Sequence, residues 1–266
     1  MLENPRAPRV REVASLARKN VRTDTGLFLV EGPQAVREAL TFRPDLVGQL
    51  FATPTAAERY GELADAAEAA DVELEFVSEA VLEAMADTVT PQGFVAVLRQ
   101  FPVSIRTVFA GEPRLVVVLE EVRDPGNAGT VIRAADSAGA DAVVLTGRTV
   151  DLYNPKVVRA TTGSLFHLPI AVNAELPDAV TRARLAGLQI LAADIKGDDL
   201  LAARQEGLLA APTAWIFGNE ARGLEPEHLA LADRALAVPV YGHAESMNLA
   251  TAASVCLYES AFALRA

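Results

Sequence analysis

Short apolar runs alternate along the whole chain with longer segments whose apolar residues recur at helical spacing. In the first hundred residues the short runs predict four strands, at 27–30, 47–52, 74–77 and 94–99. The helically spaced segments predict helices at 10–19, 34–40, 56–70 and 78–85, the last capped by Ser78. This alternation predicts a compact α/β unit.

A second series of alternating strands and helices follows after residue 114. The predicted strands lie at 115–119, 142–145, 165–172, 188–193, 213–217 and 234–240. The predicted helices lie at 127–138, 154–162, 177–185, 198–204 and 249–264, and Gly139 ends the first of them. Strands that alternate with helices indicate a parallel sheet. The run at 115–119 is apolar throughout, as expected of a strand covered on both faces.

The two series are separated by a stretch rich in chain-breaking residues. Pro102, Gly111 and Pro113 interrupt any regular element there. The sequence therefore predicts two domains, residues 1–105 and residues 106–266.

Composition narrows the class of protein. Half of the residues are hydrophobic, yet no apolar run reaches the length of a membrane span, and the first residues lack the basic-then-apolar order of a signal peptide. Cys256, the one cysteine, lies among apolar residues, so we expect a buried thiol and a cytoplasmic protein. The three histidines are scattered, so no metal site is predicted.

The charges are unevenly distributed along the chain. The chain carries a net charge of −11, which opposes binding to nucleic acid. The first 22 residues nevertheless contain six basic and only two acidic residues. A solvated helix and a helix that contacts RNA phosphates both fit this pattern.

Polar residues and glycines gather directly after two predicted strands, in turns at 218–224 and 238–248. The carboxyl ends of strands in open α/β sheets are where ligands bind. The turn after the strand at 115–119 lacks the G-x-G-x-x-G glycines, which argues against a dinucleotide-binding oxidoreductase.

Three segments in this order resemble one known family. They are 127–135 (NAGTVIRAA), 217–224 (FGNEARGL) and 238–250, which contains VPV and ESMNLA. Together they resemble the SpoU (TrmH-type) RNA ribose 2′-O-methyltransferases of the SPOUT class, over residues 115–266. Segments 28–32 and 90–93 look like the RNA substrate-binding domain of many members, whose fold is similar to that of ribosomal proteins.

The resemblance implies a C-terminal α/β domain tied in a deep trefoil knot, which sequence physics alone would not predict. It implies a homodimer and S-adenosylmethionine as the cofactor, held by Gly218, Val238, Met247 and Asn248. Members usually carry leucine or a similar residue at the position of Met247. RNA contacts are expected from Arg18, Lys19 and Arg22 in the basic N-terminal helix.

The same resemblance implies a set of catalytic residues, each of which also has a structural interpretation. Arg133 matches the family arginine proposed to deprotonate the ribose hydroxyl, but a guanidinium suits phosphate binding and alkoxide stabilisation better. Asn127 is well placed as a helix N-cap, Glu220 as a solvated loop carboxylate, and Ser246 and Asn248 as caps of the last helix. The implied set is Arg133, Asn127, Glu220, Ser246 and Asn248.

The expected function is therefore S-adenosylmethionine-dependent methylation of a ribose 2′-hydroxyl in RNA. Ribosomal RNA of the large subunit is the preferred substrate, because the N-terminal domain looks like a ribosomal protein. Transfer RNA is an alternative substrate, and a non-catalytic RNA-binding protein on the same scaffold is an alternative function.

Overall fold

The computed structural model describes all 266 residues and shows two compact units. The N-terminal unit contains Met1–Phe101 and Asp151–His167, and the C-terminal unit contains Pro102–Val150 and Leu168–Ala266. The chain first leaves the N-terminal unit close to the boundary predicted after residue 105. It returns for the segment Asp151–His167, whose Tyr153, Leu165 and Phe166 are buried. No helix is both long enough and apolar enough to cross a membrane.

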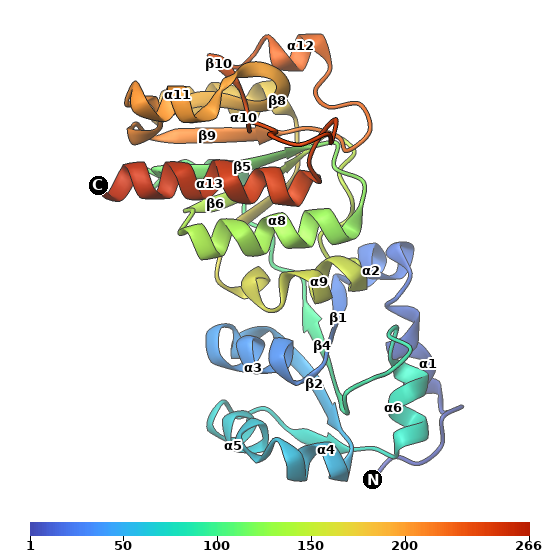
Figure 1. Ribbon diagram of the computed structural model, residues 1–266. Coiled ribbons are helices and arrows are strands. Elements are labelled where there is room, and N and C mark those ends of the chain that lie inside the picture. Colours follow the sequence, from blue (N-terminus) through green and yellow to red (C-terminus); the bar gives the residue numbers. More distant parts are fainter. The chain divides into compact units, whose positions relative to one another are not determined.

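The N-terminal unit is built on a four-stranded sheet with the order β1-β4-β2-β3 (Figure 1). β4 runs antiparallel to both β1 and β2, and β3 runs parallel to β2. α1 and α6 cover one face and α3 to α5 the other. The bounds are α1 (Pro8–Ser15), α2 (Lys19–Thr25), β1 (Leu27–Glu31), α3 (Pro33–Phe42), β2 (Val47–Ala52), α4 (Pro54–Arg59), α5 (Gly61–Ala69), β3 (Leu74–Phe76), α6 (Glu79–Met85) and β4 (Phe94–Arg99).

Two helices predicted in this unit are each divided in two. The helix predicted at 56–70 is interrupted at Tyr60, where the backbone leaves the helical region. The helix predicted at 10–19 ends at Ser15, and α2 begins at Lys19 after an extended Arg18. Helical periodicity is continuous across both breaks, so the hydrophobic pattern alone does not reveal them.

The side chain of Arg22 explains the second break. Its Nη1 donates hydrogen bonds to the carbonyl oxygens of Leu16 and Ala17, at 2.8 and 2.7 Å, which become available because the helix stops there. Its Nη2 lies 2.6 Å from Oδ2 of Asp151, in the returning segment. Arg22 is only 2% exposed, so its assignment as a phosphate contact is wrong: this guanidinium already has its partners. Arg18 and Lys19 are exposed.

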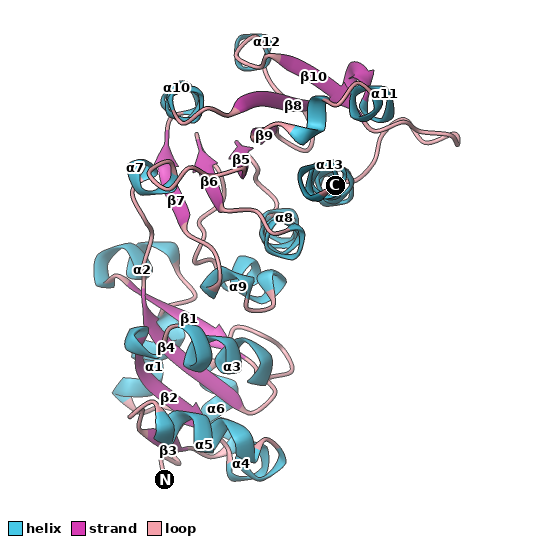
Figure 2. Ribbon diagram, turned by 90° about the vertical axis from the view of Figure 1, so that its left-hand side faces the viewer, coloured by secondary structure: helices cyan, strands magenta, loops and turns pink.

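The C-terminal unit contains a six-stranded, fully parallel sheet with the order β10-β8-β9-β5-β6-β7. α8 and α13 pack on one another on one side of it, and α7 and α10 lie on the other (Figure 2). The bounds are α7 (Ile105–Val108), β5 (Leu115–Glu120), α8 (Pro125–Ala138), β6 (Ala142–Thr146), β7 (Ile170–Ala174), α10 (Leu176–Leu185), β8 (Gln189–Asp199), α11 (Leu200–Gln205), β9 (Thr213–Phe217), α12 (Pro226–Leu229), β10 (Arg234–Ala237) and α13 (Leu249–Arg265); α9 (Pro155–Thr161) belongs to the N-terminal unit.

Most of the predicted parallel sheet is confirmed, including the complete burial of β5. Three strands differ in extent. The strand predicted at 165–172 begins only at Ile170, after a turn of 3₁₀ helix, and β10 ends at Ala237, before Pro239. β8 runs on to Asp199 and contacts β10, and a Cβ atom on Gly197 would lie 2.5 Å from the backbone of Ala235. A glycine thus permits this close approach.

Replacement of Arg22 tests its structural role. Arg22→Ala leaves the Asp151 carboxylate and two carbonyl groups without their donor, so we expect it to lower the free energy of unfolding by about 3 kcal/mol. Arg18→Ala, at the exposed neighbouring position, is the control and is expected to change it by less than about 0.5 kcal/mol. Urea unfolding monitored by circular dichroism measures both; equal, small effects would remove Arg22 from the structural account.

Candidate active site

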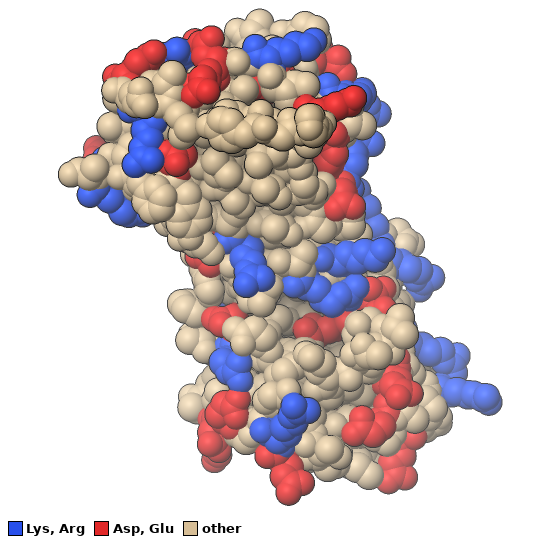
Figure 3. Space-filling model, viewed as in Figure 1, with Lys and Arg blue, Asp and Glu red and all other residues tan.

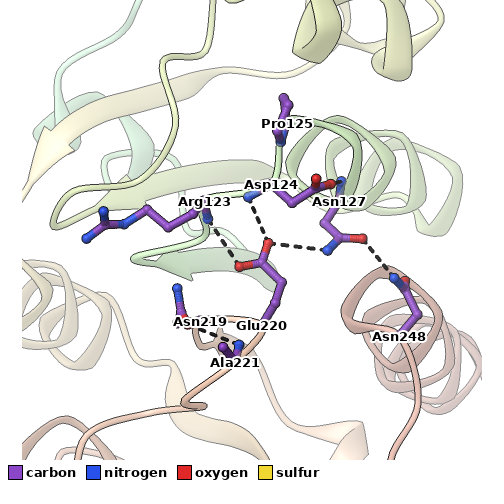
Figure 4. Close-up of a pocket in the computed structure, with 8 residues that line it drawn as sticks. All are labelled: Arg123, Asp124, Pro125, Asn127, Asn219, Glu220, Ala221 and Asn248. Atoms are coloured by element: carbon purple, nitrogen blue, oxygen red, sulfur yellow. Dashed lines mark hydrogen bonds between the residues drawn. The ribbon is translucent and has the colours of Figure 1, made fainter.

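An open pocket of about 760 Å³ lies where β5 and β9, neighbours in the parallel sheet, reach their carboxyl ends. Three structural features supply its walls: the turn between β5 and α8 with the first turn of α8, the turn after β9, and the residue that caps α13 (Figure 4). The lining residues are Arg123, Asp124, Pro125, Asn127, Asn219, Glu220, Ala221 and Asn248.

The carboxylate of Glu220 connects these features. Its Oε2 accepts a hydrogen bond from the backbone N–H of Arg123 at 3.2 Å, and its Oε1 accepts one from the N–H of Asp124 at 3.1 Å. Oε1 also accepts from Nδ2 of Asn127 at 3.3 Å. These donors surround the start of α8, where the helix dipole favours a negative charge. Glu220 is therefore a positioned anion rather than only a solvated loop carboxylate.

The sequence suggested Asn127 as the N-cap of α8, but Asn127 does not cap this helix. The cap is Asp124, whose Oδ1 accepts from the N–H of Asn127 at 2.7 Å, and Pro125 occupies the first helical position. Because the cap is filled by Asp124, the side chain of Asn127 is available for the pocket. It bridges Glu220 and Asn248.

Asn248 serves both as a cap and as a pocket residue. Its Oδ1 accepts from the N–H groups of Ala250 and Thr251, which confirms it as the N-cap of α13. Its Nδ2 donates to Oδ1 of Asn127 at 2.9 Å. One amide thus ties the start of α13 to the start of α8, and a continuous path of hydrogen bonds runs from Glu220 through Asn127 to Asn248.

The turn after β9 is held by its own backbone. Asn219 and Gly223 exchange two N–H to carbonyl hydrogen bonds, and Oδ1 of Asn219 accepts from the N–H groups of Ala221 and Arg222. Gly223 has a φ of +68°, which favours glycine. A Cβ atom on Gly218 would lie 2.6 Å from the backbone of Gly223, so this position has no room for a side chain.

The remaining predicted site residues lie outside the pocket lining. Arg133 is exposed on α8, and Ser246 is exposed in the segment between β10 and α13. In the same segment Val238 is half-buried and Met247 is 40% exposed. Of the predicted residues, the pocket lining therefore includes Asn127, Glu220 and Asn248, and it does not include Gly218, Arg133, Ser246, Val238 or Met247.

Sequence reasoning missed two residues that shape the site. Asp124 precedes a proline and caps the helix, a pattern that the sequence shows directly. Asn219 stands in a turn that was recognised as functional, but its role is to hold that turn and, through Nδ2, the carbonyl oxygen of Glu121 at 2.9 Å. No group of three or more histidine, cysteine or acidic side chains lies close enough together to hold a metal ion. Cys256 is buried, as expected, and burial raises the pKa of its thiol to about 12.

Two family models match the chain. Residues 114–258 match the SpoU rRNA Methylase family, and residues 29–103 match the domain described as RNA 2′-O ribose methyltransferase substrate binding. These ranges contain every residue of the pocket and all four strands of the N-terminal sheet except the first two residues of β1.

Relatives match over nearly the whole length. The 23S rRNA (guanosine(2553)-2′-O)-methyltransferase RlmP of Bacillus subtilis is 34% identical, and the match covers 97% of each chain. The crystal structure of the AdoMet-bound rRNA methyltransferase from Sinorhizobium meliloti, 31% identical, superposes with a TM-score of 0.84 over 97% of this chain and 96% of that one. A structure described as concerning 2-OH methylation of C/U34 on tRNA, 30% identical, covers 58% of this chain and 99% of its own, with a TM-score of 0.51.

The lack of space at Gly218 gives a prediction about stability. Gly218→Ala forces a methyl group against backbone atoms that cannot move independently, so we expect a loss of about 1–3 kcal/mol in the free energy of unfolding. Gly242→Ala is the control, because nothing lies within 4 Å of the added methyl group. Thermal unfolding compares the two; a Gly218→Ala protein as stable as the control contradicts the close packing of this turn.

Proposed function

Because the chain belongs to the SpoU rRNA methylase family, we propose that it transfers a methyl group from S-adenosylmethionine to a ribose 2′-hydroxyl of 23S ribosomal RNA. The observation that carries the proposal is the assembly of Asn127, Glu220 and Asn248, three residues of the implied catalytic set, in one pocket. We propose that the protein acts in the cytoplasm.

The share of this chain that each relative covers favours ribosomal RNA over transfer RNA as the substrate. The relative named for 23S rRNA shares both domains with this chain, since it is covered to 97%. The structure described for a tRNA position covers 58% of this chain. We propose that the N-terminal unit directs the chain to ribosomal RNA and supplies RNA contacts, including Arg18 and Lys19, which are exposed.

The residues at the strand ends fit S-adenosylmethionine. When bound, it supplies a methyl group on a positively charged sulfur, so the chain needs only to orient the reactants and to help the hydroxyl lose its proton. Gly218, Val238, Met247 and Asn248 would hold it. The absence of room for a side chain at Gly218 leaves backbone amide and carbonyl groups as the contact surface there.

Glu220 positions other groups in this proposal and does not remove the ribose proton. Both of its oxygens already accept hydrogen bonds, from two backbone N–H groups and from Asn127. For the reaction, the role of Glu220 is therefore to fix the orientation of Asn127 and of the first turn of α8. Asn127 in turn accepts a hydrogen bond from Asn248, which lies in the segment proposed to hold the cofactor.

Arg133 stabilises the developing alkoxide and binds the neighbouring phosphate. It lies six residues after Asn127 on α8, about 120° around the helix and about 9 Å along it. Because it is exposed and outside the pocket lining, we propose that it serves the pocket of a second subunit. Tyr258 and Phe262, exposed on α13 beside α8, give apolar surface for that contact.

The homodimer and the knot are testable parts of the same proposal. Sedimentation equilibrium should give twice the mass of the chain, and a monomer at micromolar concentration would exclude a shared site. We also propose that the segment after β10 is threaded into a trefoil knot. The family resemblance supports this threading, and a crystal structure with bound S-adenosylmethionine would show the path of the chain.

The activity itself is tested with tritiated S-adenosylmethionine and RNA purified from cells that lack the gene. We expect label in 23S rRNA, located at a ribose by its resistance to alkaline cleavage, and none in tRNA. Label in tRNA alone supports the alternative substrate. Binding of RNA without any transfer supports a non-catalytic protein.

Replacement of Arg133 separates chemistry from binding. Arg133→Ala should lower the single-turnover transfer rate by a factor of about 100 or more, because a positioned charge at the reacting centre is lost. Arg133→Lys should be nearly as slow, since an ammonium lacks the two-pronged geometry of the guanidinium. Cofactor affinity, measured by calorimetry, should stay near the wild-type value in both. A wild-type transfer rate in Arg133→Ala would make this arginine structural.

A further inference from the structure

Three arginines converge on one carboxylate beside the pocket. Oε1 of Glu121 lies 3.3 Å from Nε of Arg148, and its Oε2 lies 3.2 Å from Nη2 of Arg123 and 2.8 Å from Nη2 of Arg222. The three come from different turns, after β5, β6 and β9. Glu225 also contacts Arg222, at 3.3 Å. The group of Glu121, Arg123, Arg148 and Arg222 is called the arginine cluster below.

The backbone holds the centre of this cluster in an uncommon conformation. Glu121 has a φ of +52°, in the left-handed region that residues other than glycine rarely adopt. Its carbonyl oxygen accepts from Nδ2 of Asn219 at 2.9 Å, and its N–H donates to the carbonyl oxygen of Thr146. Such strain persists where the surroundings enforce it, and it is concentrated at functional sites.

The charges of the cluster do not balance. Three guanidinium groups share Glu121, and only Arg222 has a second acidic partner. Burial acts to raise the pKa of Glu121, but hydrogen bonds from Arg148 and Arg123 lower it, so the carboxylate stays ionised and keeps the arginines together. The side chains of Arg123, Arg148 and Arg222 are 48, 79 and 54% exposed, and each guanidinium carries five N–H donors. Unused donors therefore face solvent.

The cluster adjoins the pocket through Arg123. The backbone N–H of Arg123 binds Glu220, whereas its side chain extends away from that carboxylate (Figure 4). Figure 3 shows Lys and Arg side chains along the right-hand edge of the C-terminal unit, interleaved with acidic ones, on the side where β5 and β9 end. In a chain with a net charge of −11, three arginines nevertheless gather here around one glutamate.

We propose that the arginine cluster binds phosphodiester groups of the RNA next to the nucleotide that enters the pocket. The inference rests on the proposed function and adds a phosphate site to it. Guanidinium groups bind phosphate oxygens with two parallel N–H donors, which fixes the register of a strand as well as adding affinity. Glu121 holds the three side chains in place before RNA arrives, so less conformational entropy is lost on binding.

The test compares two double variants of equal charge change. Arg148→Ala with Arg222→Ala removes two arginines of the cluster that do not line the pocket. The control, Arg182→Ala with Arg184→Ala, removes one half-buried and one exposed arginine that are also ion-paired, to Asp178 and Asp233. Filter binding of 23S rRNA is measured between about 50 and 200 mM salt, where phosphate contacts dominate the salt dependence.

The cluster variant should bind RNA about tenfold more weakly at low salt. Its log–log salt slope should fall by about 0.7 to 0.9 for each arginine removed. The control should keep the wild-type slope. Arg148→Lys with Arg222→Lys keeps the charge and should keep the slope, while binding more weakly because the paired donors are lost.

Binding of S-adenosylmethionine, followed by calorimetry, shows whether each variant retains its folded pocket. A wild-type salt slope in the alanine variant, with cofactor binding intact, overturns the phosphate site and leaves the methyltransferase assignment untouched. Equal loss of slope in the control variant also overturns it, because the effect would then follow net charge alone. Failure of the wild-type protein to bind RNA would instead contradict the proposed function.

Discussion

The carboxylate of Glu220 is the interaction on which the candidate site depends. It accepts from the backbone at Arg123 and Asp124 and from the side chain of Asn127, and so joins the end of β9 to the start of α8. Asn127 extends the connection to Asn248 and the start of α13. Without the carboxylate, three N–H donors near the start of α8 would need other acceptors, and only Asn219 and Arg222, through Glu121, would still join the two turns.

Much of the C-terminal sheet could be predicted from the sequence, because strands covered on both faces appear as uninterrupted apolar runs, as β5 and β9 do. The site residues Asn127, Glu220 and Asn248 were also predicted, from the family resemblance and from their position after predicted strands. The contacts that these residues make could not be predicted. That Asp124 rather than Asn127 caps α8, and that Glu220 binds backbone groups distant in sequence, depends on how the turns meet in space.

The features that the sequence did not reveal depend on contacts between residues far apart in the chain. The segment Asp151–His167 lies between two strands of the C-terminal sheet, yet its buried side chains belong to the N-terminal unit. Arg22 was assigned to a basic, RNA-facing helix because its neighbours in sequence are basic, but its partner Asp151 lies far along the chain. Local charge patterns do not record such pairs. In the segment 238–248, Asn248 has hydrogen-bond partners, whereas the predicted cofactor contacts at Val238 and Met247 rest on the family resemblance.

The most direct test of this account is the single-turnover methyl-transfer rate of Glu220→Gln at saturating RNA and cofactor. Glutamine keeps the shape of the side chain but turns one acceptor into a donor that faces an N–H group. The account predicts a rate lower by a factor of about 100, as a small misplacement of reacting groups produces. Glu225→Gln, a neighbouring carboxylate without backbone partners, should keep the wild-type rate. A wild-type rate in Glu220→Gln would contradict the claim that this carboxylate organises the site.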